Sequence, residues 1–100
     1  MRKFLIAALV AAGPAFAATE MVATNGKDEV RIFDQKCETA SVLRHIPEGM
    51  RSQYRKAMAR IDGQPWYACY VIAQGSVHLV YEDGDLGVIP AGMFKEPNNV

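Results

Sequence analysis

Cys37 and Cys69 are the two cysteines of this 100-residue chain, and their chemistry depends on whether they are oxidised. They form no Cys-x-x-Cys motif, and the sequence has only two histidines that could complete a metal shell. We therefore predict a structural disulfide, with a redox-active or metal-binding thiol pair as the weaker alternative. Such a disulfide would close a loop of about 30 residues, which in the chain-entropy model stabilises a fold by roughly 3–4 kcal/mol.

The acidic stretch 82–85 groups carboxylates around a glycine, a ligand set that calcium prefers. An EF-hand loop counted from Asp83 would need a glutamate at its last position, where this sequence has Phe94. The motif therefore fails, and aspartate beside glycine is more typical of a tight turn. We predict a hairpin turn here and no metal site.

His45 and His78 are the side chains best suited to act as a general base near neutral pH. A general base needs a positioned nucleophile and a group that orients it. No serine lies in a nucleophile-elbow sequence, and both cysteines are assigned to the disulfide. We predict no catalytic residue and no cofactor. A non-enzymatic protein is therefore expected, and a small hydrolase is the least favoured alternative.

The segment 44–60 is rich in arginine and lysine, whereas the rest of the chain is slightly acidic. On a helical wheel its cations fall on both sides of an apolar stripe, which suits either a packed helix with solvated flanks or an interfacial helix. The predicted partner surface combines these cations with the single tryptophan: Arg51, Arg55, Lys56, Arg60 and Trp66. The larger aromatic group is expected mainly in the core, and it would indicate a recognition surface if several members were exposed together. Its members are Trp66, Tyr67, Tyr70 and Tyr81.

Residues 1–17 have the features of a cleaved export signal. Arg2 and Lys3 precede a short apolar run, which Gly13-Pro14 ends before the small residues that lead to Ala17. The apolar run is far shorter than the roughly 20 residues that span a bilayer. We predict cleavage after Ala17, no transmembrane segment after cleavage, and a periplasmic or secreted protein.

Residues 18–100 would then form a single small domain. Cleavage removes Arg2 and Lys3 from the 11 basic residues and none of the 11 acidic ones, so the domain is slightly acidic. Nucleic-acid-binding domains are usually strongly basic, and we predict no nucleic-acid partner. Because so short a chain builds a thin core, the predicted disulfide supplies a large share of its stability. The oligomeric state does not follow from the composition.

Turn signals and apolar periodicity predict the elements of this domain. Asn25-Gly26 is typical of a hairpin turn, so an N-terminal hairpin is expected to end near Phe33. Apolar residues between 50 and 61 recur at helical spacing, and we predict an amphipathic helix over 48–58, although 58–61 could equally enter a strand. The segment 65–89 is typical of an antiparallel meander. The predicted fold class is α+β: a small antiparallel sheet of four to five strands, one amphipathic helix and one disulfide.

The strand expected over 65–73 is apolar on both faces. Trp66 and Tyr70 share one face, while Cys69 and Val71 share the other. Such a pattern is typical of a central strand that is covered on both sides. The candidate covers are the predicted helix on one side and the N-terminal hairpin or a loop on the other. The disulfide would then tie the end of the first hairpin to the middle of the sheet.

The order of these features resembles a known group of proteins. An export signal precedes a cysteine after the first hairpin, then Pro47-Glu48, the motif Trp-Tyr-Ala-Cys at 66–69 and the motif Val-Tyr-Glu-Asp-Gly-Asp-Leu-Gly-Val-Ile-Pro at 80–90. The pattern resembles small exported proteins of unknown function from Gram-negative bacteria and their phages. The resemblance covers most of the mature chain. It implies a periplasmic or secreted location, allows a phage origin, and brings no activity or functional residues with it.

We expect a non-enzymatic periplasmic binding or inhibitory module that acts on an envelope or periplasmic protein. Small size, the predicted disulfide and the lack of a catalytic motif favour this expectation. The alternative is an envelope-interacting protein that uses the basic helix on anionic lipid or cell-wall polymer.

Overall fold

A computed structural model describes residues 20–97, which form mainly antiparallel sheet. The predicted export signal, residues 1–17, lies outside the described residues. The strands are β1 (Glu20–Asn25), β2 (Asp28–Lys36), β3 (Arg55–Ile61), β4 (Gln64–Ala73), β5 (Ser76–Tyr81) and β6 (Leu86–Pro90). The helices are α1 (Ala40–Leu43) and the 3-10 helices η2 (Glu48–Gln53) and η3 (Ala91–Met93).

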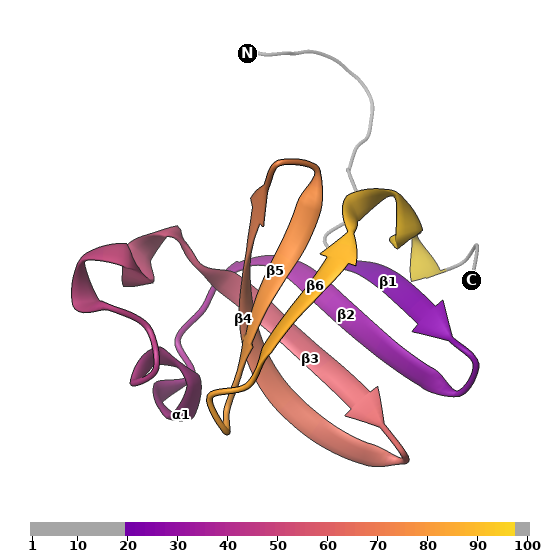
Figure 1. The fold of residues 1–100 in the computed structure, drawn as a ribbon, viewed down its shortest axis with the longest axis horizontal. Helices are drawn as coiled ribbons and strands as arrows, with labels where there is room; N and C mark the ends of the chain where they lie inside the picture. The colour runs from indigo at the N-terminus through magenta and orange to yellow at the C-terminus, as the bar shows by residue number, and fades with distance from the viewer. Residues whose placement is uncertain (1–19, 98–100) are drawn as a thin grey trace.

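The strands lie side by side in chain order, and each is antiparallel to the next. The sheet is curled, so that β6 returns to the side of the molecule where β1 lies (Figure 1). The backbone of Val22 in β1 exchanges two hydrogen bonds with Lys95, with N···O distances of 2.7 and 2.9 Å. The C-terminal segment thus closes one part of the gap between β1 and β6 and leaves the rest without strand pairing.

Glycine-containing turns join most neighbouring strands. The predicted N-terminal hairpin is confirmed, but Asn25 pairs with Asp28, so the two loop residues are Gly26 and Lys27. Of these two only Gly26 has a positive φ (65°), which makes the turn type II′ instead of the type I′ expected for an Asn-Gly loop. Within the predicted meander, β4 and β5 are joined by a turn at 74–75, both of whose residues have the positive φ of a type I′ turn.

The amphipathic helix predicted over 48–58 is wrong. A 3-10 helix ends at Gln53, and residues 55–61 form β3 between β2 and β4. The segment also satisfies a period of two, because Ala57 and Ala59 are buried while Lys56 and Arg60 point to the opposite face. Pairing with two neighbouring strands satisfies its backbone on both sides, and this decided between the two periods.

The predicted fold class is therefore correct only in outline. Within residues 20–97 the sheet has six strands, not four to five, and α1 is the single α-helix, four residues long. The N-terminal hairpin, the C-terminal meander and the disulfide are as expected. The structure is mostly sheet, because the residues assigned to the long helix supply a further strand.

Buried side chains form two clusters on opposite sides of β4. The larger cluster fills the inside of the curled sheet, and alanine at Ala57, Ala59 and Ala68 lets neighbouring strands curve closely around it. The smaller cluster packs Val42 and Ile46 of the segment 37–46 against the outer face of β4 and β5. The predicted central strand covered on both sides is thus confirmed, but the cover is α1 and its flanking loops.

None of the helices in the described part of the chain is long and apolar enough to cross a membrane.

Candidate functional site

Three loops gather at one end of the curled sheet, which we call the loop end. They are the β1–β2 turn, the β3–β4 turn and the β5–β6 loop, at 26–27, 62–63 and 82–85. They share this end because successive strands of an antiparallel meander alternate in direction, and all three lie in the lower half of Figure 1. Asp62 donates its backbone N–H to a carboxylate oxygen of Asp28 over 3.0 Å, which joins the first two loops.

A cavity of about 200 Å³ opens at the loop end, and we call it the aromatic–carboxylate pocket. Strand alternation directs Trp66 and Tyr81 to the inner side of the sheet, where they lie at its open end beyond the filled core. The β5–β6 loop adds two carboxylates to these aromatic walls. The lining residues are Ile61, Trp66, Tyr81, Asp83 and Asp85.

Tyr81 is half-buried, and its environment raises the pKa of its hydroxyl. Burial is the largest cause of the raised pKa, followed by the negative charges of Asp85 and Asp83. A β-carbon added to Gly87 on β6 would lie 3.3 Å from Cε2 of Tyr81. The bare backbone at Gly87 therefore leaves the room that the tyrosine ring occupies.

The loop that carries the two carboxylates is held from both sides. Asp85 donates its N–H to Oδ1 of Asp83 over 3.0 Å, and Gly84 donates its N–H to the Tyr81 carbonyl over 2.8 Å. A ring nitrogen of His45, from the segment that covers β4, lies 3.1 Å from the Glu82 carbonyl. The carboxylates are therefore presented by an ordered turn, as the hairpin reading of this stretch predicted.

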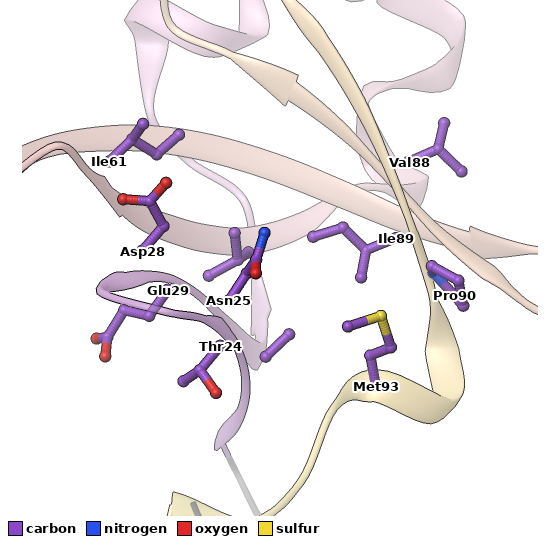
Figure 2. A pocket seen from close by; sticks show the side chains of 11 residues that line it. Thr24, Asn25, Asp28, Glu29, Ile61, Val88, Ile89, Pro90 and Met93 are labelled. Atoms are coloured by element: carbon purple, nitrogen blue, oxygen red, sulfur yellow. The ribbon is translucent and has the colours of Figure 1, made fainter.

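A second cavity, of about 270 Å³, lies between the β1–β2 hairpin and β6 with η3, and we call it the β1–β6 groove. In Figure 2, Ile89 and Met93 line it from the C-terminal side, and Thr24 and Asn25 face them from the hairpin. Ile61 lines both the groove and the aromatic–carboxylate pocket. The two cavities are therefore neighbours at the loop end.

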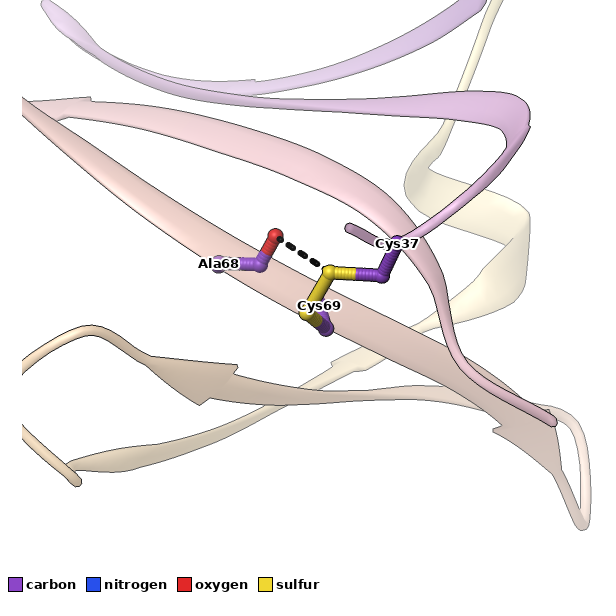
Figure 3. Close-up of a disulfide and its surroundings, with 3 residues drawn as sticks. All are labelled: Cys37, Ala68 and Cys69. Carbon is purple, nitrogen blue, oxygen red and sulfur yellow. Dashed lines mark hydrogen bonds between the residues drawn. A yellow bond between two sulfur atoms is a disulfide. The ribbon is translucent and has the colours of Figure 1, made fainter. Parts of the chain in front are cut away.

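The predicted disulfide is confirmed. Cys37 and Cys69 are bonded, their Cα atoms lie 5.8 Å apart, and their exposed fractions are 1% and 0% (Figure 3). Cys37 is the residue immediately after β2, and Cys69 lies within β4. The bond therefore ties the end of the first hairpin to the middle of the sheet. Its role here is to support the covering segment against the sheet.

The cations of the predicted partner surface do not lie together. Arg51 donates from Nε to the Ile46 carbonyl over 2.9 Å and thereby holds its own loop. Arg55 forms an ion pair with Asp34, while Arg60 lies at the other end of β3.

Lys56 places its Nζ 5.3 Å from the centre of the Phe33 ring, on the outer face of the sheet. Trp66 is the one member of the predicted surface that lines the aromatic–carboxylate pocket. The amphipathic helix that the envelope-binding alternative invoked is replaced by η2, which carries Arg51, and by β3, which carries Arg55, Lys56 and Arg60.

The other candidate residues take separate positions. Tyr70 is buried and donates its hydroxyl to the Phe33 carbonyl over 3.0 Å, whereas Tyr67 has an exposed fraction of 50%. His78 lies 3.3 Å from the Ala73 carbonyl. Among residues 20–97, no group of three or more histidine, cysteine, aspartate or glutamate side chains is arranged to hold a metal ion.

Sequence reasoning named Trp66 and the acidic turn separately but did not join them. Tyr81 lines the pocket together with both, but from the sequence it was expected mainly in the core. A signal was present: Trp66 and Tyr81 have the strand parity of inward residues, and the acidic turn directly follows Tyr81.

The chain matches no protein-family model, and comparisons with curated proteins and with solved structures found no match either. The resemblance to small exported proteins of Gram-negative bacteria and their phages therefore stays a prediction.

Proposed function

We propose that this protein is an exported, non-enzymatic binding module that acts on a protein partner, and that its aromatic–carboxylate pocket receives a basic side chain of that partner. The observation that carries the proposal is the lining of this cavity. Two aromatic rings and the carboxylates of Asp83 and Asp85 surround one space of about 200 Å³. Within residues 20–97, no salt bridge involves either carboxylate.

The chemistry of this lining suits a lysine or arginine side chain. A cation over a tryptophan or tyrosine face gains about 0.5–1 kcal/mol at exposed sites and about 2 kcal/mol when desolvated. Each surface carboxylate adds roughly 0.2–1 kcal/mol. These contributions sum to about 1–4 kcal/mol, so a single basic side chain would bind with a dissociation constant of about millimolar at the strongest. A partner protein would add the contacts around it.

The predicted location outside the cytoplasm supports a binding role at the envelope. A buried disulfide is typical of proteins that mature outside the cytoplasm, and residues 1–17 have the sequence of an export signal. An envelope or periplasmic protein with an exposed basic residue is the partner that fits these features. A phage origin remains the expectation that the sequence resemblance adds.

Trp66 offers a direct test, because it is the single tryptophan of the chain and lines the pocket. We would titrate the oxidised protein with arginine amide and follow tryptophan fluorescence, with norleucine amide as the neutral probe. The expected result is a saturable change with arginine amide alone. The combined substitution Asp83→Asn and Asp85→Asn should weaken it by about twofold to thirtyfold, given the size of surface charge interactions.

Asp62→Asn is the matched control, because Asp62 lies on a neighbouring loop and does not line the pocket. It should leave the titration unchanged. Equal binding of both amides, or equal losses in the Asp62 variant and the double variant, would overturn the proposed site.

A partner can then be sought with the same variants. Crosslinking in a periplasmic extract should recover a protein with the unmodified chain and recover less of it with the double aspartate variant. Recovery that does not depend on Asp83 and Asp85 would contradict the proposal that the partner uses this pocket.

A further inference from the structure

The edge of β6 carries free backbone groups beside the aromatic–carboxylate pocket. Tyr81 donates its N–H to the Asp85 carbonyl over 2.8 Å, and these two residues face each other at the start of the β5–β6 pairing. In an antiparallel pair, hydrogen-bonded and non-hydrogen-bonded positions alternate. The backbone N–H and C=O groups of Leu86 and Val88 therefore point away from β5, and Val88 also lines the β1–β6 groove.

The far end of this edge is blocked. Pro90 occupies the next outward position and has no N–H to donate. Ala91 turns back to donate its N–H to the Gly75 carbonyl over 2.9 Å. The usable edge is thus the part of β6 nearest the loop end.

The facing strand also has a free stretch at the same end. Val22 bonds to Lys95, so its backbone points away from β2, and alternation gives Thr24 the same direction. Thr24 lines the groove, beyond the point where the C-terminal segment closes the gap. Within residues 20–97, β1 and β6 are not neighbours in the sheet, so the groove is bordered by two unpaired edges.

The side chains along this edge are apolar and exposed. Leu86 and Val88 have exposed fractions of 73% and 62%, and Met93 of the neighbouring η3 has 48%. Soluble proteins usually protect such an edge with charge, a bulge or a covering segment. Among residues 20–97, Pro90 gives that protection at one end of the edge.

We infer that the β1–β6 groove binds an extended basic segment of a partner protein, which pairs with β6 as an additional strand and places its cation in the aromatic–carboxylate pocket. The inference rests on the proposed function, because the same pocket receives the cation. Addition of a strand to a sheet edge is a common mode of peptide recognition, in which backbone hydrogen bonds give affinity and side-chain pockets give specificity. Asp85 directly precedes Leu86, so a side chain beside the start of β6 is next to the pocket.

Charge complementarity favours a basic occupant over a second copy of this chain. The loop end, with the strand residues next to its turns, carries more acidic than basic side chains. Glu29 is paired with Arg31, which leaves as acidic residues Asp28, Asp62, Glu82, Asp83 and Asp85, and as basic ones Lys27 and Arg60.

The test uses the oxidised protein and an acetylated, amidated hexapeptide, Arg-Thr-Val-Thr-Val-Thr. Two further peptides carry N-methyl groups, one at the second, fourth and sixth positions and the other at the third and fifth. Alternate residues of an added strand turn their N–H groups toward β6, so one methylated peptide should bind within about twofold of the parent. The other should bind at least about tenfold more weakly by Trp66 fluorescence.

Val88→Ser should weaken the parent peptide several-fold, while Ile72→Ser is the matched control. Ile72 has a similar exposed fraction, 60%, but lies on β4 away from the groove. Sedimentation should show a monomer that remains a monomer when the peptide is bound. Dimerisation of the free protein that is lost in the Val88 variant would overturn the inference in favour of a second copy as occupant.

The two proposals can fail separately. If the methylated peptides bind alike while arginine amide still depends on Asp83 and Asp85, the strand pairing is wrong and the pocket function stands. If one methylated register binds selectively but arginine amide does not bind, the edge pairs with peptides and the cation pocket is wrong.

Discussion

Two tyrosines, Tyr70 and Tyr81, lie on the inner side of the same sheet at opposite ends, and their surroundings differ in one respect. Burial raises the pKa of both hydroxyls. Near Tyr70 the charges of Arg55 and Asp34 oppose each other, and these two residues form an ion pair of 2.8 Å. Near Tyr81 both neighbouring charges are negative.

The polar groups at the Tyr70 end are paired within the described chain. The Tyr70 hydroxyl donates to the Phe33 carbonyl, and the Asp34 carboxylate is paired with Arg55. A recess of about 430 Å³ beside it is lined by that same ion pair. The Tyr81 end has aromatic walls and two carboxylates that form no salt bridge within residues 20–97. The recess beside Tyr70 is larger, but its charges neutralise each other. A charged ligand is therefore expected at the smaller pocket beside Tyr81, where Asp83 and Asp85 are both negative.

The largest expected effect comes from removing the Cys37–Cys69 disulfide, which supports the sheet between the two ends. Replacing Cys37 and Cys69 together with alanine should lower the free energy of unfolding by roughly 3–4 kcal/mol, because the unfolded chain regains the entropy of the open loop. Urea unfolding of the oxidised protein and the variant measures the difference. A wild-type sample treated with reductant should match the variant, and an unchanged midpoint would contradict the role of the bond.

Gly87→Ala should disturb the Tyr81 end alone. The added β-carbon would lie 3.3 Å from Cε2 of Tyr81 and 3.6 Å from Cδ1 of Leu79, so the ring must shift. Overpacking of this kind costs about 1–3 kcal/mol of stability, and arginine amide should bind more weakly. Gly49→Ala is the control, since nothing lies within 4 Å of its added carbon. Equal stability of the two variants would show that the ring does not depend on the glycine.

Removing single hydroxyls should separate the two tyrosines. Tyr70→Phe loses the hydrogen bond to the Phe33 carbonyl and should cost about 0.5–1.5 kcal/mol in urea unfolding. Tyr81→Phe should change stability by less than about 0.5 kcal/mol, as for a substitution that breaks no structural contact. A larger loss at Tyr81 than at Tyr70 would reverse the comparison between the two ends.

Titration of the tyrosines gives the smallest and most specific effect. Asp83→Asn should lower the raised pKa of Tyr81, because it removes one of the two negative charges that raise it. Arg55→Gln should instead raise the pKa of Tyr70 further, because Arg55 lowers it. Absorbance of the tyrosinate ion, measured as pH rises from about 9 to about 12, follows both groups. Shifts of the same sign in the two variants would contradict the opposed charge environments.

These raised pKa values also set the direction of the pH dependence of stability. The folded state holds each hydroxyl proton more tightly than the unfolded chain, whose tyrosine pKa is about 10. The contribution is therefore fully present below about pH 10 and is lost as pH rises through the folded-state pKa. Urea unfolding at alkaline pH should show the decline, and Tyr70→Phe combined with Tyr81→Phe should reduce it.

Local signals in the sequence were sufficient for much of the sheet. The turns at 74–75 and 82–85 and the strand boundaries around them follow from glycine and aspartate chemistry, which acts over two to four residues. The disulfide followed from two cysteines in a chain with a predicted export signal. The central strand followed from its two apolar faces.

The sequence alone did not decide the segment 55–61. Its apolar residues fit a helix face and a strand face, and the choice depended on whether two neighbouring strands were available to pair with it. The candidate site depended on the same choice. Only with β3 in the sheet do Ile61, Trp66 and Tyr81 meet at one end.

By itself, therefore, the sequence determined the disulfide pairing, the hairpin turns and the shared strand face of Trp66 and Tyr70, all of which depend on local chemistry or on residue count. The tertiary structure decided the number of strands, the unpaired edges of β1 and β6, and the meeting of Asp83 and Asp85 with two aromatic rings. The physical reason is that these features arise from pairing between distant segments. The curl of the sheet brings the two edges near each other, and no local pattern encodes that curl.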